Sequence, residues 1–146
     1  MDAHREAFFV NFAQIRPPQA HLALSAELIG VHGDFIDFPQ IPLGGKRSIP
    51  PNDFLGTTEA ESLHRLECAI AGHPEEFEAL KHFLSKAGNT LFLLAGNHDI
   101  DFCWQRVLKR FRQHIGATNR NFRFGMAYKE GGVYATHGHQ YSHENR

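Results

Sequence analysis

Three continuous apolar runs along the chain predict buried strands. They cover residues 27–32, 90–95 and 133–135, and each is shorter than a typical helix. The last run belongs to a longer stretch, residues 122–136, which predicts two short strands separated near a Gly-Gly pair. A polar motif follows each of the three runs directly.

Elsewhere, apolar residues recur at spacings of three and four, which predicts amphipathic helices. Residues 58–61 resemble a capping box, and the helix that they open ends at Gly72. Pro74 suits the first position of the next helix, and residues 104–115 predict a third helix. A shorter helix is predicted over residues 5–15, before a Pro-Pro pair that ends it. The apolar stripe of this shorter helix consists of Phe8, Phe12 and Ile15.

The alternation of helices and strands favours an α/β fold with a largely parallel sheet. At 146 residues the chain is long enough for one core, so we expect a single domain over residues 1–146. Residues 39–57 are rich in Pro and Gly and predict a long irregular loop. Such a loop either shapes a substrate pocket or is a flexible insertion, and the sequence leaves both open.

The three polar motifs stand at the ends of the predicted strands. They are Gly-Asp-Phe-Ile-Asp at residues 33–37, Gly-Asn-His-Asp at residues 96–99 and Thr-His-Gly-His-Gln at residues 136–140. In an open α/β sheet, ligands bind in the crevice at the carboxyl ends of the strands. We therefore expect oxygen and imidazole donors from all three motifs to converge, and such donors suit divalent metal ions. The pattern predicts a metal-dependent hydrolase.

The residue types indicate individual roles. Asp34 can point into the crevice and bridge two cations, whereas Asp37 suits a place behind the ligands or at the turn. Asn97 offers a neutral oxygen to a hard cation. His98 can stabilise or protonate a leaving oxygen, and Asp99 can hold the orientation of that ring. The alternative is that these residues form ordinary polar turns after buried strands.

The third motif supplies histidines. His137 follows a predicted strand and is a candidate imidazole ligand, and His139, two residues on, can share its face. Histidines near a chain end can also be merely exposed and solvated. A structural zinc module is a weaker alternative, because such sites usually use cysteines.

Composition narrows the possible partners. The formal net charge of -1 gives no electrostatic reason to expect nucleic acid or an anionic membrane. Cys68 and Cys103 are too few for a disulfide framework, and their places in helical patterns predict buried or half-buried thiols. No apolar run is long enough to span a bilayer, and residues 1–6 lack the features of a secretory signal, so we expect a cytoplasmic protein.

Taken in order, the motifs resemble the calcineurin-like metallophosphoesterase family. Residues 136–146 are further similar to bacterial members with a His-Gly-His-Gln-Tyr segment, distantly related to enzymes that split the pyrophosphate of a UDP-linked lipid precursor. The resemblance implies a sandwich of mixed sheets flanked by helices. It also implies two divalent metal ions, such as manganese, iron or zinc, which activate water for attack on a phosphate ester or pyrophosphate.

The resemblance also assigns residues. It implies that Asp34 bridges the two metals, that Asn97 and His137 bind the second metal, and that His98 is the catalytic histidine with Asp99 as its partner. The substrate would be a small phosphate ester or a nucleotide-type molecule.

Two parts of the family pattern are altered. Members open with a strand leading to Asp-x-His, which binds the first metal; Asp2 and His4 carry these letters, but no strand is predicted before them. Either they are ligands, or the chain begins downstream of that motif. Members also end with Gly-His-x-His, whereas Tyr141 stands at the last position here, and His139 is then the less certain ligand. We expect a domain shortened at both ends, and the alternative function is an inactive fragment that binds metal weakly or not at all.

Overall fold

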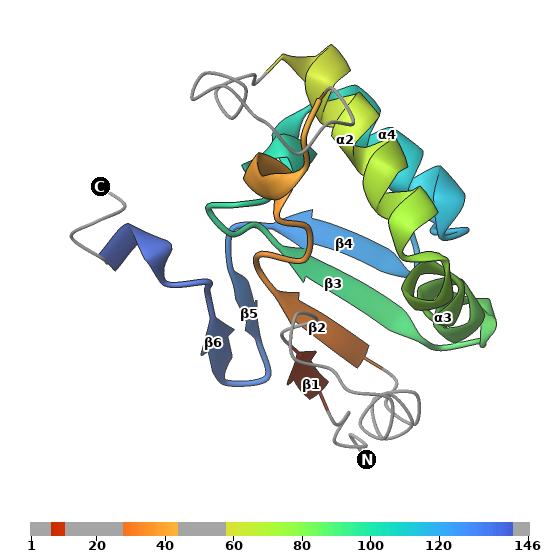
Figure 1. Cartoon of the computed structure of the whole chain (residues 1–146). Coiled ribbons are helices and arrows are strands. Elements are labelled where there is room, and N and C mark those ends of the chain that lie inside the picture. Colours follow the sequence, from red (N-terminus) through yellow and green to blue (C-terminus); the bar gives the residue numbers. More distant parts are fainter. Residues whose placement is uncertain (1–6, 11–27, 44–57, 142–146) are drawn as a thin grey trace.

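The computed structural model describes residues 7–10, 28–43 and 58–141. Its main sheet has four strands in the order β1-β2-β3-β4, and all three strand pairs are parallel (Figure 1). The strands are β1 (Ala7–Val10), β2 (Leu28–His32), β3 (Thr90–Leu94) and β4 (Phe122–Gly125). Because the strands are parallel, their carboxyl ends share one edge of the sheet.

Three α-helices cover one face of this sheet (Figure 1). They are α2 (Glu59–Gly72), α3 (Pro74–Ser85) and α4 (Gln105–His114). The predicted capping box opens α2: Thr58 accepts a hydrogen bond from the Glu61 backbone, and the Glu61 side chain bonds back to Thr58. The short 3-10 turns are η2 (Phe38–Gln40), η3 (Ile100–Cys103) and η4 (His139–Tyr141).

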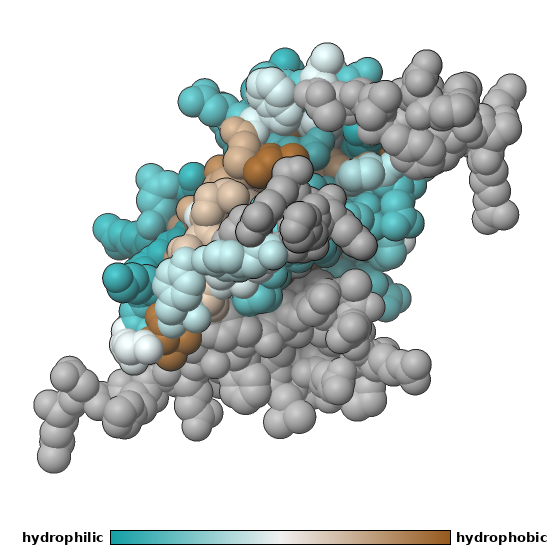
Figure 2. All heavy atoms as spheres, turned by 90° about the vertical axis from the view of Figure 1, so that its left-hand side faces the viewer, coloured by the Kyte–Doolittle hydropathy of each residue, from teal (hydrophilic) through white to brown (hydrophobic). Residues whose placement is uncertain are grey.

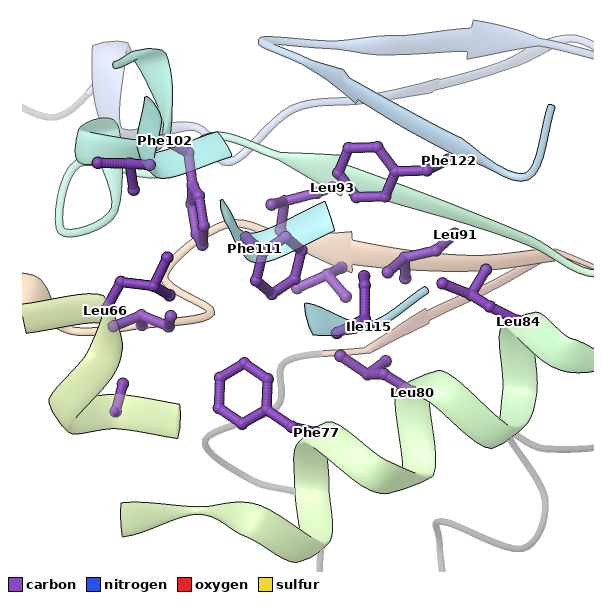
Figure 3. Close-up of a cluster of buried hydrophobic side chains, with 14 of the residues drawn as sticks. Leu66, Phe77, Leu80, Leu84, Leu91, Leu93, Phe102, Phe111, Ile115 and Phe122 are labelled. Carbon is purple, nitrogen blue, oxygen red and sulfur yellow. The ribbon is translucent and has the colours of Figure 1, made fainter. Parts of the chain in front are cut away.

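The core lies between the helices and the sheet (Figure 3). Phe111 of α4 is fully buried, and its ring packs edge-on against Phe35, Phe77 and Phe102. The other buried apolar side chains drawn around it include Leu66, Leu80, Leu84, Leu91, Leu93, Ile115 and Phe122. The abundant phenylalanines are therefore mostly core residues, as predicted.

A two-stranded antiparallel sheet of β5 (Tyr128–Glu130) and β6 (Val133–Ala135) packs on the opposite face (Figure 1). Side chains alternate between the faces of a strand, so Phe92 of β3 points away from the helices. The Tyr128 ring meets Phe92 edge-on at 5.2 Å between centroids. Together with Leu28 and Leu94 they form a second, smaller apolar cluster.

Three expectations need correction. A strand, β1, occupies residues 7–10, where a helix was predicted over residues 5–15. A short apolar run suits either element, and pairing with β2 decides for the strand. Residues 122–136 form three strands rather than two, because β4 joins the parallel sheet. Cys68 and Cys103 are exposed, although both were expected to be at least half-buried.

The α/β class is confirmed, with a parallel sheet, three helices and a small antiparallel sheet. The finer expectation of a calcineurin-like sandwich stays a prediction. Among the described helices, none is both long and apolar enough to cross a membrane.

Candidate functional site

The loops after β2 and β3 lie side by side at the carboxyl edge of the parallel sheet. The last residues paired between these strands are His32 and Leu94. Residues 33–37 and 96–99 therefore leave the sheet as neighbours. Figure 2 looks onto this side of the molecule, where brown and tan apolar residues lie beside teal hydrophilic ones.

Asp34 reaches from the first loop to the second. It adopts a left-handed backbone conformation, with φ at 50°, directly after Gly33 with φ at 79°. Its Oδ1 accepts a hydrogen bond of 3.0 Å from the backbone N–H of His98. Gly96 leaves room for this carboxylate, since a Cβ there would lie 2.1 Å from Asp34 Oδ1. Residues from two predicted motifs are thus in direct contact.

His137 brings the third motif to the same place. Its Nε2 lies 3.1 Å from Asp34 Oδ2. The ring packs so closely on Gly33 that a Cβ there would lie 2.5 Å from His137 Nδ1. Burial lowers the pKa of His137, although the Asp34 carboxylate opposes this shift. Neutral imidazole is the form that binds metals, and Nδ1 is buried with no hydrogen-bond partner among the described residues.

His98 lies against Asp37 rather than against Asp99. The distance from His98 Nδ1 to Asp37 Oδ1 is 2.9 Å. The other oxygen of Asp37 accepts a 2.6 Å hydrogen bond from the Gln40 side chain, which fixes the carboxylate. The prediction that Asp99 orients the His98 ring is therefore wrong in this structure, where the carboxylate next to the ring is that of Asp37. Sequence favoured Asp99 because it directly follows His98, whereas Asp37 belongs to the first motif and reaches His98 only in the folded chain.

Asp99 instead links the two loops by hydrogen bonds to the backbone of each. Its fully buried carboxylate accepts a 2.6 Å hydrogen bond from the backbone N–H of Gly96 and one of 2.8 Å from that of Phe35. Burial raises the pKa of Asp99 to about 6, and the two hydrogen bonds only partly oppose this. Asp99 is thus a positioning residue that joins the loops carrying Asp34 and His98.

The remaining candidates lie at the border of this cluster. Asn97 is half-buried in the second loop. The His139 ring lies 5.3 Å from that of His137, between centroids, and its Nδ1 is buried without a partner in the described part of the chain. His32, the last residue of β2, was not singled out from sequence, yet its ring lies 6.3 Å from that of His137. The only sequence signal for His32 is its position at the strand end.

Asp2 and His4 lie outside the described residues. In the chain they precede β1, whereas the family pattern places Asp-x-His after a strand.

No three His, Cys, Asp or Glu side chains among the described residues gather in a group that could hold a metal ion. Two of the expected ligands, Asp34 and His137, lie side by side, with 3.1 Å between Asp34 Oδ2 and His137 Nε2. Their donor types suit a divalent cation.

Comparison with known proteins adds no assignment: no family model, curated protein or solved structure matches the chain. The interpretation of the site therefore depends on its geometry and on the motifs.

Proposed function

We propose that the chain is a hydrolase of phosphate esters of the calcineurin-like metallophosphoesterase type. The observation that best supports this is the contact between Asp34 and His137, from motifs at opposite ends of the described chain. Polar side chains that converge at the carboxyl edge of a parallel sheet are typical of a ligand site. The substrate class and the cytoplasmic location stay predictions.

Asp34, Asn97 and His137 would hold a divalent metal ion. Such an ion would polarise the phosphoryl oxygens and lower the pKa of a bound water. The lowered pKa of His137 supports this role, because a neutral ring has a lone pair to give.

His98 has the position for proton transfer. Its side chain is 41% exposed at the mouth of the site, while Nδ1 lies against the Asp37 carboxylate. With Nδ1 beside the Asp37 carboxylate, Nε2 would face the substrate, and a ring protonated at both nitrogens could give its Nε2 proton to the leaving oxygen. Asp99 keeps the loops of Asp34 and His98 in register and does not itself touch the substrate.

The second candidate function is that of a chain which binds metal weakly and hydrolyses nothing. One observation favours it: Tyr141 stands where the family pattern has its last histidine. Asp2 and His4, the expected ligands of the first metal, lie outside the described residues.

Metal content and hydrolysis, measured together, separate the two functions. We would determine the manganese and zinc bound per chain and the turnover of p-nitrophenyl phosphate and bis(p-nitrophenyl) phosphate. The active enzyme should bind close to two metals, and Asp34→Asn, which tolerates the left-handed backbone, should abolish both binding and turnover. Glu75→Gln on α3 is the matched control. Full activity in Asp34→Asn would contradict the proposal, and weak metal binding with no turnover would favour the inactive chain.

A further inference from the structure

A cavity lies behind the first loop of the site, between that loop, α2 and the start of α3. Its volume is about 520 Å³, which is within the range of small-molecule binding sites. The residues that line it are Phe35, Ile36, Asp37, Gln40, Ile41, Cys68, Ala69, Gly72, His73, Glu76 and Phe77. It is distinct from the cluster of Asp34 and His137.

Residues 35–37 form a wall that the cavity shares with the candidate site. The backbone N–H of Phe35 is bonded to Asp99 on the site side, while its ring packs edge-on against Phe77. Asp37 contacts His98 on the site side and also lines the cavity. The cavity and the candidate site therefore share the Asp37 carboxylate.

The lining of the cavity determines what it can accept. Phe35, Ile36, Ile41, Ala69 and Phe77 give it apolar walls. The carboxylates among its lining residues come from Asp37, which lies beside His98, and from Glu76, which lies 3.6 Å from the lining His73; no Lys or Arg lines the cavity in the described part of the chain. An anion next to two carboxylates is repelled, whereas an amine or hydroxyl group can bond to them.

We propose that this cavity binds an apolar group that bears an amine or a hydroxyl, such as an arylalkyl amine or alcohol. That this group is the organic part of a substrate depends on the proposed function. That the cavity binds the group does not depend on it. It favours a single phosphate on an apolar alcohol over a nucleotide-type polyphosphate, whose further phosphates would meet the carboxylates of Asp37 and Glu76.

Three probes with one ring and different charges test the proposal. Benzylamine, benzyl alcohol and benzoate would be titrated into the full chain in EDTA, with amide chemical shifts of Phe35, Asp37 and Gly72 as the readout. We expect benzylamine to bind about tenfold more tightly than benzoate, a difference of roughly 1.4 kcal/mol. Benzyl alcohol should fall between them. Benzoate binding as tightly as benzylamine, or no shifts with any probe, would overturn the proposal.

A filled cavity provides the matched control. A Cβ at Gly72 would meet no heavy atom within 4 Å, so Gly72→Trp can extend into the cavity without a clash at its base. We expect this variant to lose benzylamine binding. Ala71→Trp is exposed on the same helix, outside the lining, and should bind as the native chain does. Circular dichroism would establish that both variants fold, and unchanged binding in a folded Gly72→Trp would refute the site.

A charge variant checks the chemical preference. Glu76→Gln keeps the shape of the lining and removes one carboxylate, so it should narrow the gap between benzylamine and benzoate without abolishing benzylamine binding. An unchanged gap would overturn the assignment to amines and alcohols. Because these titrations use no metal and no turnover, absence of hydrolysis would leave them intact. Hydrolysis without benzylamine binding would reject only this inference.

Discussion

The helix-covered core and the loop cluster at the carboxyl edge of the sheet are held together in opposite ways. In the core, each large side chain shares its contacts with many others, as Phe111 does with the rings around it. In the site, a few specific polar contacts at Asp34 and Asp99 join two loops, and Gly33 and Gly96 leave the space for them. The core therefore contributes most to stability, whereas the geometry of the site depends on a few individual side chains and on two glycines that have no Cβ.

The largest expected loss of stability comes from the core. Phe111 is fully buried, and Phe111→Ala should lower the free energy of unfolding by about 3–5 kcal/mol, because it leaves a cavity among four rings. Urea unfolding measures this. Leu108→Ala, on the same helix but only partly buried, is the control and should cost less. Equal losses of unfolding free energy in the two variants would contradict the contrast between buried and partly buried positions of this helix.

Asp99 carries the next largest effect, and it depends on pH. Its pKa rises from an ordinary value of 3.8 to about 6 in the folded chain because the carboxyl is buried. Between these values the unfolded chain has lost the proton and the folded chain still holds it, so stability falls as pH rises through this window. The contribution lost by pH 7 is about 3 kcal/mol, at 1.36 kcal/mol per pKa unit.

Asp99→Asn cannot titrate, so this part of the pH dependence should disappear. Urea unfolding from pH 4 to pH 7 in EDTA would compare the variant with the native chain, and Glu75→Gln, on the surface, is the control. The amide NH₂ cannot accept a hydrogen bond from a backbone N–H, so the variant should be roughly 1–3 kcal/mol less stable than the native chain near pH 4. This difference should shrink toward pH 7, because only the native chain loses stability as Asp99 ionises. The same slope in Asp99→Asn and the native chain would contradict the assignment.

The contrast between core and site also explains what the sequence could predict. The three α-helices followed from apolar periodicity and from local signals such as the capping box at Thr58 and Glu61, which need no distant partner. The meeting of Asp34 with residues 96–99 followed from the parallel order of the strands. These features depend on rules that act over short stretches or on sheet topology.

What failed depends on tertiary contacts or on backbone geometry. The run at residues 7–10 suited either a helix or a strand, and only its pairing with β2 decided. The partner of His98 depends on how the loop turns at Asp34, whose left-handed φ no spacing rule reveals. His32 approaches His137 only because the β5–β6 hairpin folds back on the sheet. The residues around His32 and His137 do not predict that fold.

Gly96 offers a test of the site that leaves the core alone. A Cβ there would lie 2.1 Å from Asp34 Oδ1 and 2.5 Å from Asp34 N, so Gly96→Ala must push the two loops apart. We expect the loss of the bond from His98 N–H to Asp34, a fall in stability of about 1–3 kcal/mol, and weaker metal binding. Urea unfolding and metal titration measure both.

Gly125→Ala, at the end of β4, is the matched control. The nearest atoms to its Cβ would lie 3.6 Å away, in ordinary contact, so the variant should keep its metal affinity. If Gly96→Ala binds metal as Gly125→Ala does, the close approach of the loops is not needed for the site.

The smallest expected effect has the opposite sign. Gly72 ends α2 without a left-handed backbone, and a Cβ there would meet no heavy atom within 4 Å. Gly72→Ala should therefore stabilise the chain by about 0.4–1 kcal/mol, because it restricts the unfolded state and creates no strain. Gly116→Ala provides the contrast, since its φ of 67° is left-handed and a side chain there should destabilise the fold by about 1–2 kcal/mol. Thermal unfolding should move the two variants in opposite directions. If both variants were destabilised, the absence of strain and of close neighbours at Gly72 would not be enough to predict the effect of a side chain there.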